Sequence, residues 1–286
     1  MNLTEFRKSD SSTSPHFLLF GNPVSHSLSP LMHNTAAAYY ELDTRYYAIK
    51  LEQQEFTTLA AHLNEEAFKG ANITIPYKQL LTDYMDRLDE TASEIGAINT
   101  IVRESYSLVG YNTDSYGFAV PLEAYDEELE ESRVVVFGTG GATKAIVYAL
   151  QNMNVSEIVL ISRTPSGNKE MDKSEKVRVE GYESWTAFAE EASLIVNATP
   201  LGMSPKTHET PIHEEEKDIL SGKICYDIVY NPVKTRFLTL AEEAGARTIG
   251  GLEMLMHQGS RSFELWTGNP FPITEVRNKL HEAIKE

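Results

Sequence analysis

The sequence predicts an α/β protein with two domains, and three observations support this prediction. From His16 onward, short β-branched and aromatic runs alternate with longer amphipathic stretches, a pattern typical of βα units and a mostly parallel sheet. The chain has 286 residues, a length that suggests about two domains. A polar stretch at 125–132 interrupts the pattern just before the strongest predicted strand, 133–137.

The strands and helices are expected in alternation along the chain. Strands are expected at 17–20, 45–49, 71–75, 100–103, 133–137, 157–161, 176–179, 194–197 and 224–228. Helices are expected at 31–40, 53–64, 115–124, 140–152, 234–244, 251–267 and 274–285. Pro30 suits a first-turn position, with Ser29 as the N-cap.

The order of these elements predicts the domain boundaries. Residues 1–15 are rich in Ser and Thr and lack apolar periodicity, so we expect a loose leader without chemistry. The first domain is expected at 16–113, with a boundary near Asn112, and the second at 114–251. The last two helices have no further strand to cover, so we expect 252–286 to return to the first domain.

Composition excludes several classes of protein. The chain carries 25 Lys and Arg against 42 Asp and Glu, a net charge of −17, which argues against a nucleic acid or an anionic membrane as the main partner. A single cysteine, Cys225, excludes an internal disulfide framework and fits a reducing cytoplasm. Apolar runs such as 145–150 are far shorter than the ~20 residues of a membrane span. His26 and His33 have no third ligand nearby, so no metal site is predicted.

A glycine turn follows strand 133–137 and precedes a helix. Gly138 permits a tight turn, and Gly140 and Gly141 let the backbone approach a pyrophosphate at the helix N-terminus. Ala142 continues this turn, and the small Ala145 allows close packing of the helix on the strand. Thr143 replaces the third glycine of the strict fingerprint, so a glycine turn that binds nothing is the alternative interpretation.

The end of the next strand indicates which dinucleotide is bound. An NAD site normally carries Asp or Glu there, whereas this strand ends in Ser162, Arg163 and Thr164. An arginine and two hydroxyls suit a 2′-phosphate, so NADP is predicted, with a solvated surface role for Arg163 as the alternative. Another buried strand is followed by 197–203, which includes Thr199 and Met203 and is expected near the nicotinamide half.

Polar clusters follow strand ends in the first domain. Strand ends on one side of a parallel sheet converge, so these clusters are expected to face a common cleft suited to a small polyol acid. Taken singly, each residue also has a purely structural interpretation, as a turn, cap or surface residue. The residues are Ser27, Ser29, Thr74, Lys78, Asn99 and Asp114.

Together these motifs resemble those of the shikimate dehydrogenase family, over about five-sixths of the chain. They are the loop with Ser27, Ser29 and Pro30, segments 72–78, 96–100 and 112–114, the glycine turn, and segments 197–200, 227–232 and 251–258. The resemblance implies a substrate domain, a Rossmann-type NADP domain and a cleft between them. It also implies NADPH-linked reversible reduction of 3-dehydroshikimate to shikimate, a step of aromatic amino-acid synthesis.

The resemblance also implies roles for individual residues. Ser27 and Ser29 would bind the substrate carboxylate, and Tyr230 would line the substrate side. Gly251 and Met203 would approach the nicotinamide. The ring hydroxyls would be held by Thr74, Lys78, Asn99, Asp114 and Gln258.

Lys78 and Asp114 are the expected catalytic pair, because proton transfer must accompany hydride transfer. The sequence leaves open which of them donates the proton, and we favour Lys78 with Asp114 as its partner. Retention of Ser27 and Ser29 favours shikimate over quinate, while Ser162 replaces an Asn common in the family. A quinate/shikimate dehydrogenase using NAD or NADP and a non-catalytic NADP-binding member are the alternatives, as monomer or homodimer.

Overall fold

The computed structural model describes residues 1–167 and 174–284, which form two compact units. The first unit comprises 1–113 with 258–286, and the second comprises 114–257. The predicted helix at 274–285 is observed as α11 (Ile273–Ile284), and Lys285 lies outside the described residues.

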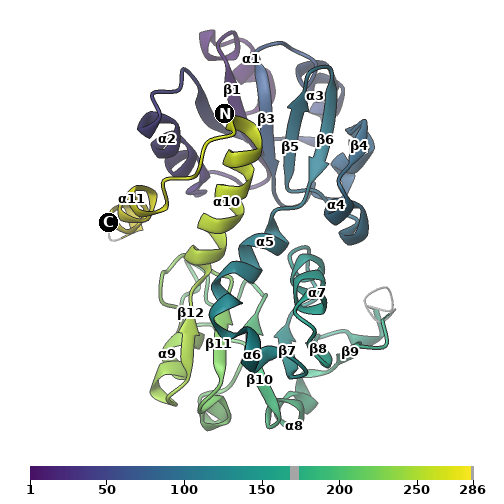
Figure 1. Cartoon of the computed structure of the whole chain (residues 1–286), viewed down its shortest axis with the longest axis vertical. Helices are drawn as coiled ribbons and strands as arrows, with labels where there is room; N and C mark the ends of the chain where they lie inside the picture. The colour runs from purple at the N-terminus through teal and green to yellow at the C-terminus, as the bar shows by residue number, and fades with distance from the viewer. Residues whose placement is uncertain (168–173, 285–286) are drawn as a thin grey trace. The chain divides into compact units, whose positions relative to one another are not determined.

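The first unit contains a six-stranded sheet with the order β2-β1-β3-β5-β6-β4 (Figure 1). The strands β1, β2 and β3 are mutually parallel, and β5 runs antiparallel to both β3 and β6. Their bounds are β1 (His16–Gly21), β2 (Arg45–Lys50), β3 (Phe68–Ile73), β4 (Arg87–Leu88), β5 (Thr100–Glu104) and β6 (Ser107–Tyr111). The sheet is therefore mixed.

Strand β6 was not predicted, because the turn before it lacks the usual residues. A tight turn joins β5 to β6 and places Ser105 at a φ of 56°. Gly or Asn normally marks such a conformation, whereas this turn consists of Ser105 and Tyr106. The short strand β4 was missed as well, since two residues carry no measurable alternation.

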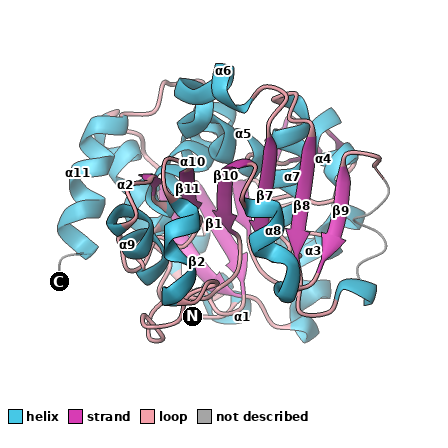
Figure 2. Cartoon of the chain, turned by 90° about the horizontal axis from the view of Figure 1, so that it is seen from below, coloured by secondary structure: helices cyan, strands magenta, loops and turns pink. Residues whose placement is uncertain are grey.

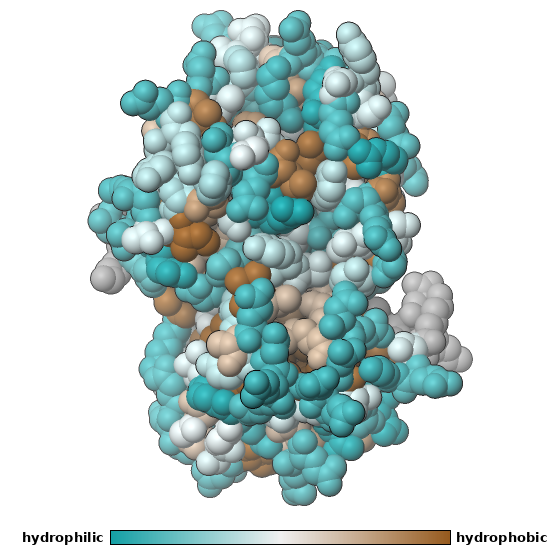
Figure 3. Space-filling view, viewed as in Figure 1, coloured by the Kyte–Doolittle hydropathy of each residue, from teal (hydrophilic) through white to brown (hydrophobic). Residues whose placement is uncertain are grey.

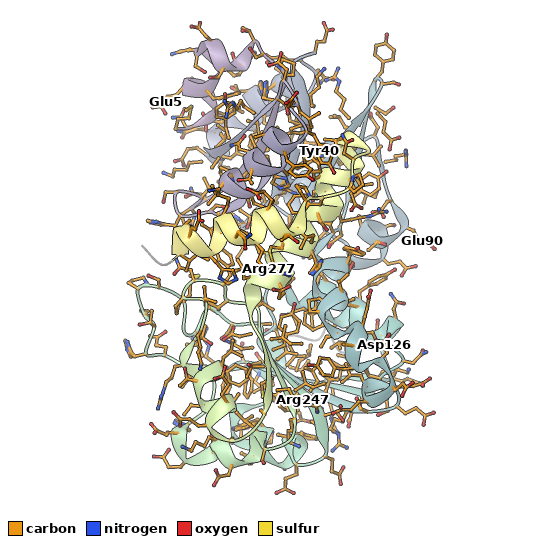
Figure 4. The ribbon with its side chains drawn as sticks, turned by 60° about the vertical axis from the view of Figure 1, so that its left-hand side comes forward. Glu5, Tyr40, Glu90, Asp126, Arg247 and Arg277 are labelled. Carbon is orange, nitrogen blue, oxygen red and sulfur yellow. The ribbon has the colours of Figure 1, made fainter. Side chains whose placement is uncertain are left out.

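The expectation of a loose leader was wrong. Residues 3–7 form the helix α1 (Leu3–Arg7), in which Asn2 and Glu5 make a reciprocal capping box. Leu3 and Phe6 are fully buried in the core of the first unit. Glu5 is labelled on this helix in Figure 4. Only two apolar side chains anchor the helix, too few to show a period in the sequence.

Besides α1, the helices of the first unit are α2 (Ser29–Tyr39), α3 (Phe56–His62), α4 (Glu90–Ile95), α11 and the later part of α10 (Gly251–Thr267). Trp266 Nε1 donates to Ile101 O over 2.9 Å, which attaches α10 to β5. The hydroxyl of Tyr40, labelled in Figure 4, donates to Pro270 O over 2.7 Å. The predicted N-cap was wrong by one residue, since Leu28 is the N-cap and Ser29 begins α2.

The second unit contains a six-stranded sheet with the order β12-β11-β10-β7-β8-β9, in which all neighbouring strands are parallel. Figure 2 shows α7 and α8 beside these strands. The strands are β7 (Arg133–Phe137), β8 (Glu157–Ile161), β9 (Val177–Glu180), β10 (Ala192–Asn197), β11 (Ile224–Asp227) and β12 (Arg247–Ile249). The helices are α5 (Asp114–Ala119), α6 (Asp126–Leu129), α7 (Thr143–Asn152), α8 (Trp185–Ala189) and α9 (Arg236–Glu243).

Strand β7 is apolar throughout because both faces of its sheet are covered. Val134 and Val136 pack in one core with α7, whereas Val135 and Phe137 pack in another with α8 and α9. The strand has the bounds that the sequence predicted, 133–137.

Among the described residues, no helix is long and apolar enough to cross a membrane. On the face drawn in Figure 3, hydrophobic residues form small groups separated by hydrophilic ones.

Candidate active site

The polar clusters of the first unit lie at one edge of its sheet. β1, β3 and β6 end at this edge, and the antiparallel β5 begins there. The pairing therefore brings together the loop after Gly21, the segment from Thr74, the residue Asn99 before β5, and the segment from Asn112. Asp114 follows directly as the first residue of α5.

The loop after β1 is closely packed against Thr74. A Cβ atom on Gly21 would lie 2.2 Å from Thr74 Cγ2, so only glycine fits there. Ser27 Oγ accepts the backbone N–H of Ser29 over 3.2 Å, and Ser29 is buried. The Ser27 hydroxyl therefore retains its own proton for another acceptor.

The segment that carries Lys78 is held at both ends. Thr74 N–H donates to Phe20 O over 2.9 Å, and Lys78 O accepts Ile98 N–H over 2.8 Å. The Tyr77 hydroxyl donates to Leu51 O over 2.6 Å. These bonds place the backbone of Lys78 beside the residue that precedes Asn99, and the lysine side chain is half-buried.

Asn99 is buried and its amide orientation is defined. The backbone N–H of Thr113 donates to Asn99 Oδ1 over 2.7 Å, and a backbone N–H can only donate. Asn99 Nδ2 donates to Thr113 Oγ1 over 2.9 Å and to Gln258 Oε1 over 3.3 Å. The side chain of Asn99 therefore joins the segment before β5 to Thr113 and to Gln258.

A layer of buried polar residues lies behind Asn99, and it includes Asn72 and Thr100 from the quoted motifs and Ser262, which was not singled out from the sequence. Asn72 Nδ2 donates to Thr100 Oγ1 and to Ser262 Oγ, each over 3.0 Å, and Asn72 Oδ1 accepts the Tyr46 hydroxyl over 2.8 Å. The one signal for Ser262 was its spacing of four residues from Gln258, which places both on one face of α10.

The glycine turn of the second unit has the geometry of an anion-binding turn. Gly138 has a φ of 105°, and a Cβ there would lie 3.1 Å from Ala198 O. A Cβ on Gly140 or Gly141 would meet no atom within 4 Å, so the backbone is open to close approach by a ligand. The turn leads through Ala142, the N-cap, into α7, whose N-terminus favours negative charge. These residues fit a dinucleotide pyrophosphate.

The end of β8 carries the residues expected beside the adenosine ribose. Ser162 is buried and accepts Thr164 N–H over 3.2 Å. Arg163 and Thr164 are exposed. Residues 162–164 include no Asp or Glu, and an exposed guanidinium at this strand end suits a phosphate.

The segment after β10 is held by a buried network around Asp227. Asp227 accepts from Thr235 Oγ1 over 2.6 Å, Val229 N–H over 2.9 Å and Asn197 Nδ2 over 3.1 Å. Burial raises the pKa of Asp227 to about 6, although these three donors oppose the shift. Asn197 Oδ1 also accepts the Thr199 hydroxyl over 2.6 Å, which positions Thr199.

The remaining predicted residues of the second unit differ in exposure. Met203 is 48% exposed, whereas Tyr230 is half-buried and burial raises its pKa. A Cβ on Gly251 would lie 2.3 Å from Ile228 O, so this position requires glycine.

The candidate substrate residues are divided between the two units. The second unit contains Asp114 and Tyr230, and the first contains Lys78, Ser27, Ser29, Thr74, Asn99 and Gln258.

The described part of the chain holds no cluster of metal-ligating side chains, and its cysteine, Cys225, is buried. No group of three or more His, Cys, Asp or Glu residues is placed to hold a metal ion within residues 1–167 and 174–284. Burial raises the pKa of the Cys225 thiol to about 12, which makes it a poor nucleophile.

The fold and site define an α/β protein with a Rossmann-type dinucleotide unit and a polar small-molecule site on a second unit. Residues 19–101 match the model of the shikimate dehydrogenase substrate binding domain, and 251–281 match that of the shikimate 5'-dehydrogenase C-terminal domain. A shikimate dehydrogenase (NADP(+)) from Moorella thermoacetica is 39% identical over 274 residues, covering 93% of this chain and 92% of the relative. The chain belongs to the shikimate dehydrogenase family.

Solved structures agree with this membership. Shikimate 5-dehydrogenase from Thermus thermophilus, in complex with NADP(H) and shikimate, has a TM-score of 0.83 and 31% identity, covering 94% of this chain and 99% of that one. Quinate dehydrogenase from Corynebacterium glutamicum, in complex with NAD, has a TM-score of 0.85 and 28% identity, and the match covers 94% of this chain and 98% of that one.

Proposed function

We propose that the protein catalyses the reversible NADPH-dependent reduction of 3-dehydroshikimate to shikimate, a step of aromatic amino-acid biosynthesis. The observation that carries this proposal is the meeting of Thr113, Asn99 and Gln258 at the sheet edge, beside the segment of Lys78. Amides, hydroxyls and one cation at one edge suit a small acid with several hydroxyls.

The serine loop binds the substrate carboxylate. Ser27 Oγ accepts the N–H of Ser29, so its own proton is directed to a further acceptor. Two hydroxyls are enough to orient a carboxylate. Thr74, Asn99 and Gln258 bind the ring hydroxyls, and Tyr230 lines the substrate side.

Lys78 is the proton donor in reduction. NADPH, when bound, supplies the hydride that reduces the ring carbonyl. The carbonyl oxygen then gains negative charge, and the Lys78 ammonium donates a proton to it. In the oxidation direction the neutral amine takes the proton back. Asp114 acts as the partner of Lys78 and orients the reacting hydroxyl.

The dinucleotide site takes NADP. The open turn of Gly140 and Gly141 at the N-terminus of α7 would hold the pyrophosphate, and Arg163, with Ser162 and Thr164, would hold the 2′-phosphate. Ala142 would contact the phosphates of the cofactor, and Thr199, Met203 and Gly251 would contact its nicotinamide half.

A quinate/shikimate dehydrogenase that accepts NAD is the second candidate, because the quinate dehydrogenase relative is 28% identical and its structure contains NAD. A non-catalytic NADP-binding protein is the third. We further propose that the protein acts in the cytoplasm, since its single cysteine is buried and needs no oxidising compartment. We also propose that it is a monomer or a homodimer.

One assay separates these candidates. The absorbance of the reduced nicotinamide, NADPH or NADH, is followed with shikimate or quinate, each with NADP or NAD, and cofactor binding is measured separately. We expect the highest kcat/KM with shikimate and NADP. Comparable rates with quinate and NAD would favour the second candidate, and cofactor binding without any turnover would favour the third.

A further inference from the structure

A cluster of three buried hydroxyls lies behind the candidate substrate site of the first unit. The hydroxyl cluster consists of Thr100, Thr113 and Ser262, of which Thr113 is 2% exposed and the other two are fully buried. Ser262 Oγ lies 2.8 Å from Thr100 Oγ1 and 3.2 Å from Thr113 Oγ1. The cluster therefore joins β5, the segment after β6, and α10.

Ser262 anchors one turn of α10 to the sheet. Its hydroxyl donates its one proton to Gln258 O over 3.0 Å. Asn72 Nδ2, from β3, donates to Ser262 Oγ over 3.0 Å. The backbone of Gln258 is thus tied through one side chain to the strands that carry the site.

The polarity of the amide pair follows from the backbone. Thr113 N–H donates to Asn99 Oδ1 over 2.7 Å, which directs Asn99 Nδ2 away from that N–H. Asn99 Nδ2 donates to Gln258 Oε1 over 3.3 Å. Because Oε1 faces Asn99, the Nε2 group of Gln258 is directed away from Asn99 and acts as a donor.

We propose that Ser262 is a positioning residue that holds Gln258 in place as a hydrogen-bond donor to an oxygen on the substrate ring. Ser262 pins the 258–262 turn to the sheet, and Asn99 selects which end of the Gln258 amide faces outward. The inference rests on the proposed function, because it assigns a direction to one contact with shikimate.

A purely structural role for Ser262 predicts different behaviour. Loss of a buried hydroxyl that only stabilises the fold lowers the Tm and leaves the KM of the folded protein for shikimate unchanged. A positioning role raises the shikimate KM in protein that remains folded, and leaves the KM for NADP unchanged because the nucleotide residues lie in the other unit.

The test is a double-mutant cycle between Ser262→Ala and Gln258→Ala. Each single variant is expected to raise the shikimate KM about tenfold, the effect of losing or misplacing one hydrogen bond. In the Gln258→Ala background, Ser262→Ala is expected to cause no further rise, because its effect passes through the missing side chain. Additive effects would overturn the inference.

Further variants keep the test decisive. Ser262→Cys preserves the volume and weakens the hydrogen bonds, so it takes the place of the alanine variant if that variant does not fold. Thr267→Val is the matched control, since the Thr267 hydroxyl donates to Phe263 O within the same helix, and the shikimate KM should not change. The side chain introduced by Gln258→Glu cannot donate a hydrogen bond as a carboxylate, and an unchanged shikimate KM in this variant would refute the donor assignment.

Absence of shikimate oxidation by the unmodified protein would refute the proposed function, whereas additivity in an active protein refutes only this inference.

Discussion

The imidazole ring of His33 stacks on the ring of Tyr46, with centroids 4.5 Å apart and an interplanar angle of 17°. His33 is 3% exposed, and neither ring nitrogen makes a hydrogen bond of ordinary geometry to any described residue. Burial lowers the pKa of His33 to about 3, and Asn72 acts in the opposite direction. A neutral, buried imidazole therefore lies one turn after Ser29 in α2.

This burial predicts a loss of stability in acid. The pKa of His33 is lower in the folded chain than the ordinary 6.5 of the unfolded chain, so stability is fully present above pH 6.5 and falls as the pH decreases toward 3. At pH 5 the loss amounts to about 2 kcal/mol. Urea unfolding at pH 7 and pH 5 measures it. His33→Phe should show a correspondingly smaller difference, and an identical difference would refute the assignment.

The helix α1 predicts a stability cost for a residue near the chain start. Phe6→Ala should lower the free energy of unfolding by about 3–5 kcal/mol, because a fully buried aromatic ring is removed. Tyr106→Ala is the control, since Tyr106 is 96% exposed and should change stability by less than about 0.5 kcal/mol. Equal effects in the two variants would show that α1 does not contribute to the core.

The assignment of Lys78 as the proton donor predicts a change in kcat. Lys78→Ala should lower kcat by about 10²–10⁴-fold with little change in the shikimate KM, because a general acid acts mainly in the transition state. Lys50→Ala, at an exposed lysine of the same unit, is the control. Steady-state NADP reduction by shikimate provides the measurement, and an unimpaired kcat would refute the assignment of Lys78 as the proton donor.

Arg163 predicts discrimination between the two dinucleotides. Arg163→Ala should raise the KM for NADP by about tenfold or more, since a charge-assisted contact with the 2′-phosphate is lost, and leave the NAD kinetics unchanged. Arg178→Ala is a matched control, because Arg178 is exposed on β9 and pairs with Glu157 and Glu180. Equal changes in the KM for NADP and for NAD would mean that Arg163 does not contact the 2′-phosphate.

Local patterns predicted the parts of the fold that depend on nearby residues. The apolar run 133–137, the glycine turn after it and the following helix are adjacent in sequence, so their geometry is encoded locally. The hairpin at Ser105 was missed because its turn residues are atypical, and α1 was missed because two buried side chains make no period.

The sequence alone determined that this chain has βα units, a dinucleotide-type turn and polar residues after strand ends, since each of these is a property of neighbouring residues. Only the tertiary structure decided that Ser262, 190 residues from Asn72, donates and accepts within the same buried layer. It likewise decided which atom of the Asn99 amide faces Gln258. The physical reason is that a hydrogen bond needs its two partners within about 3 Å, and for residues distant in sequence only the packing of strands and helices provides that proximity.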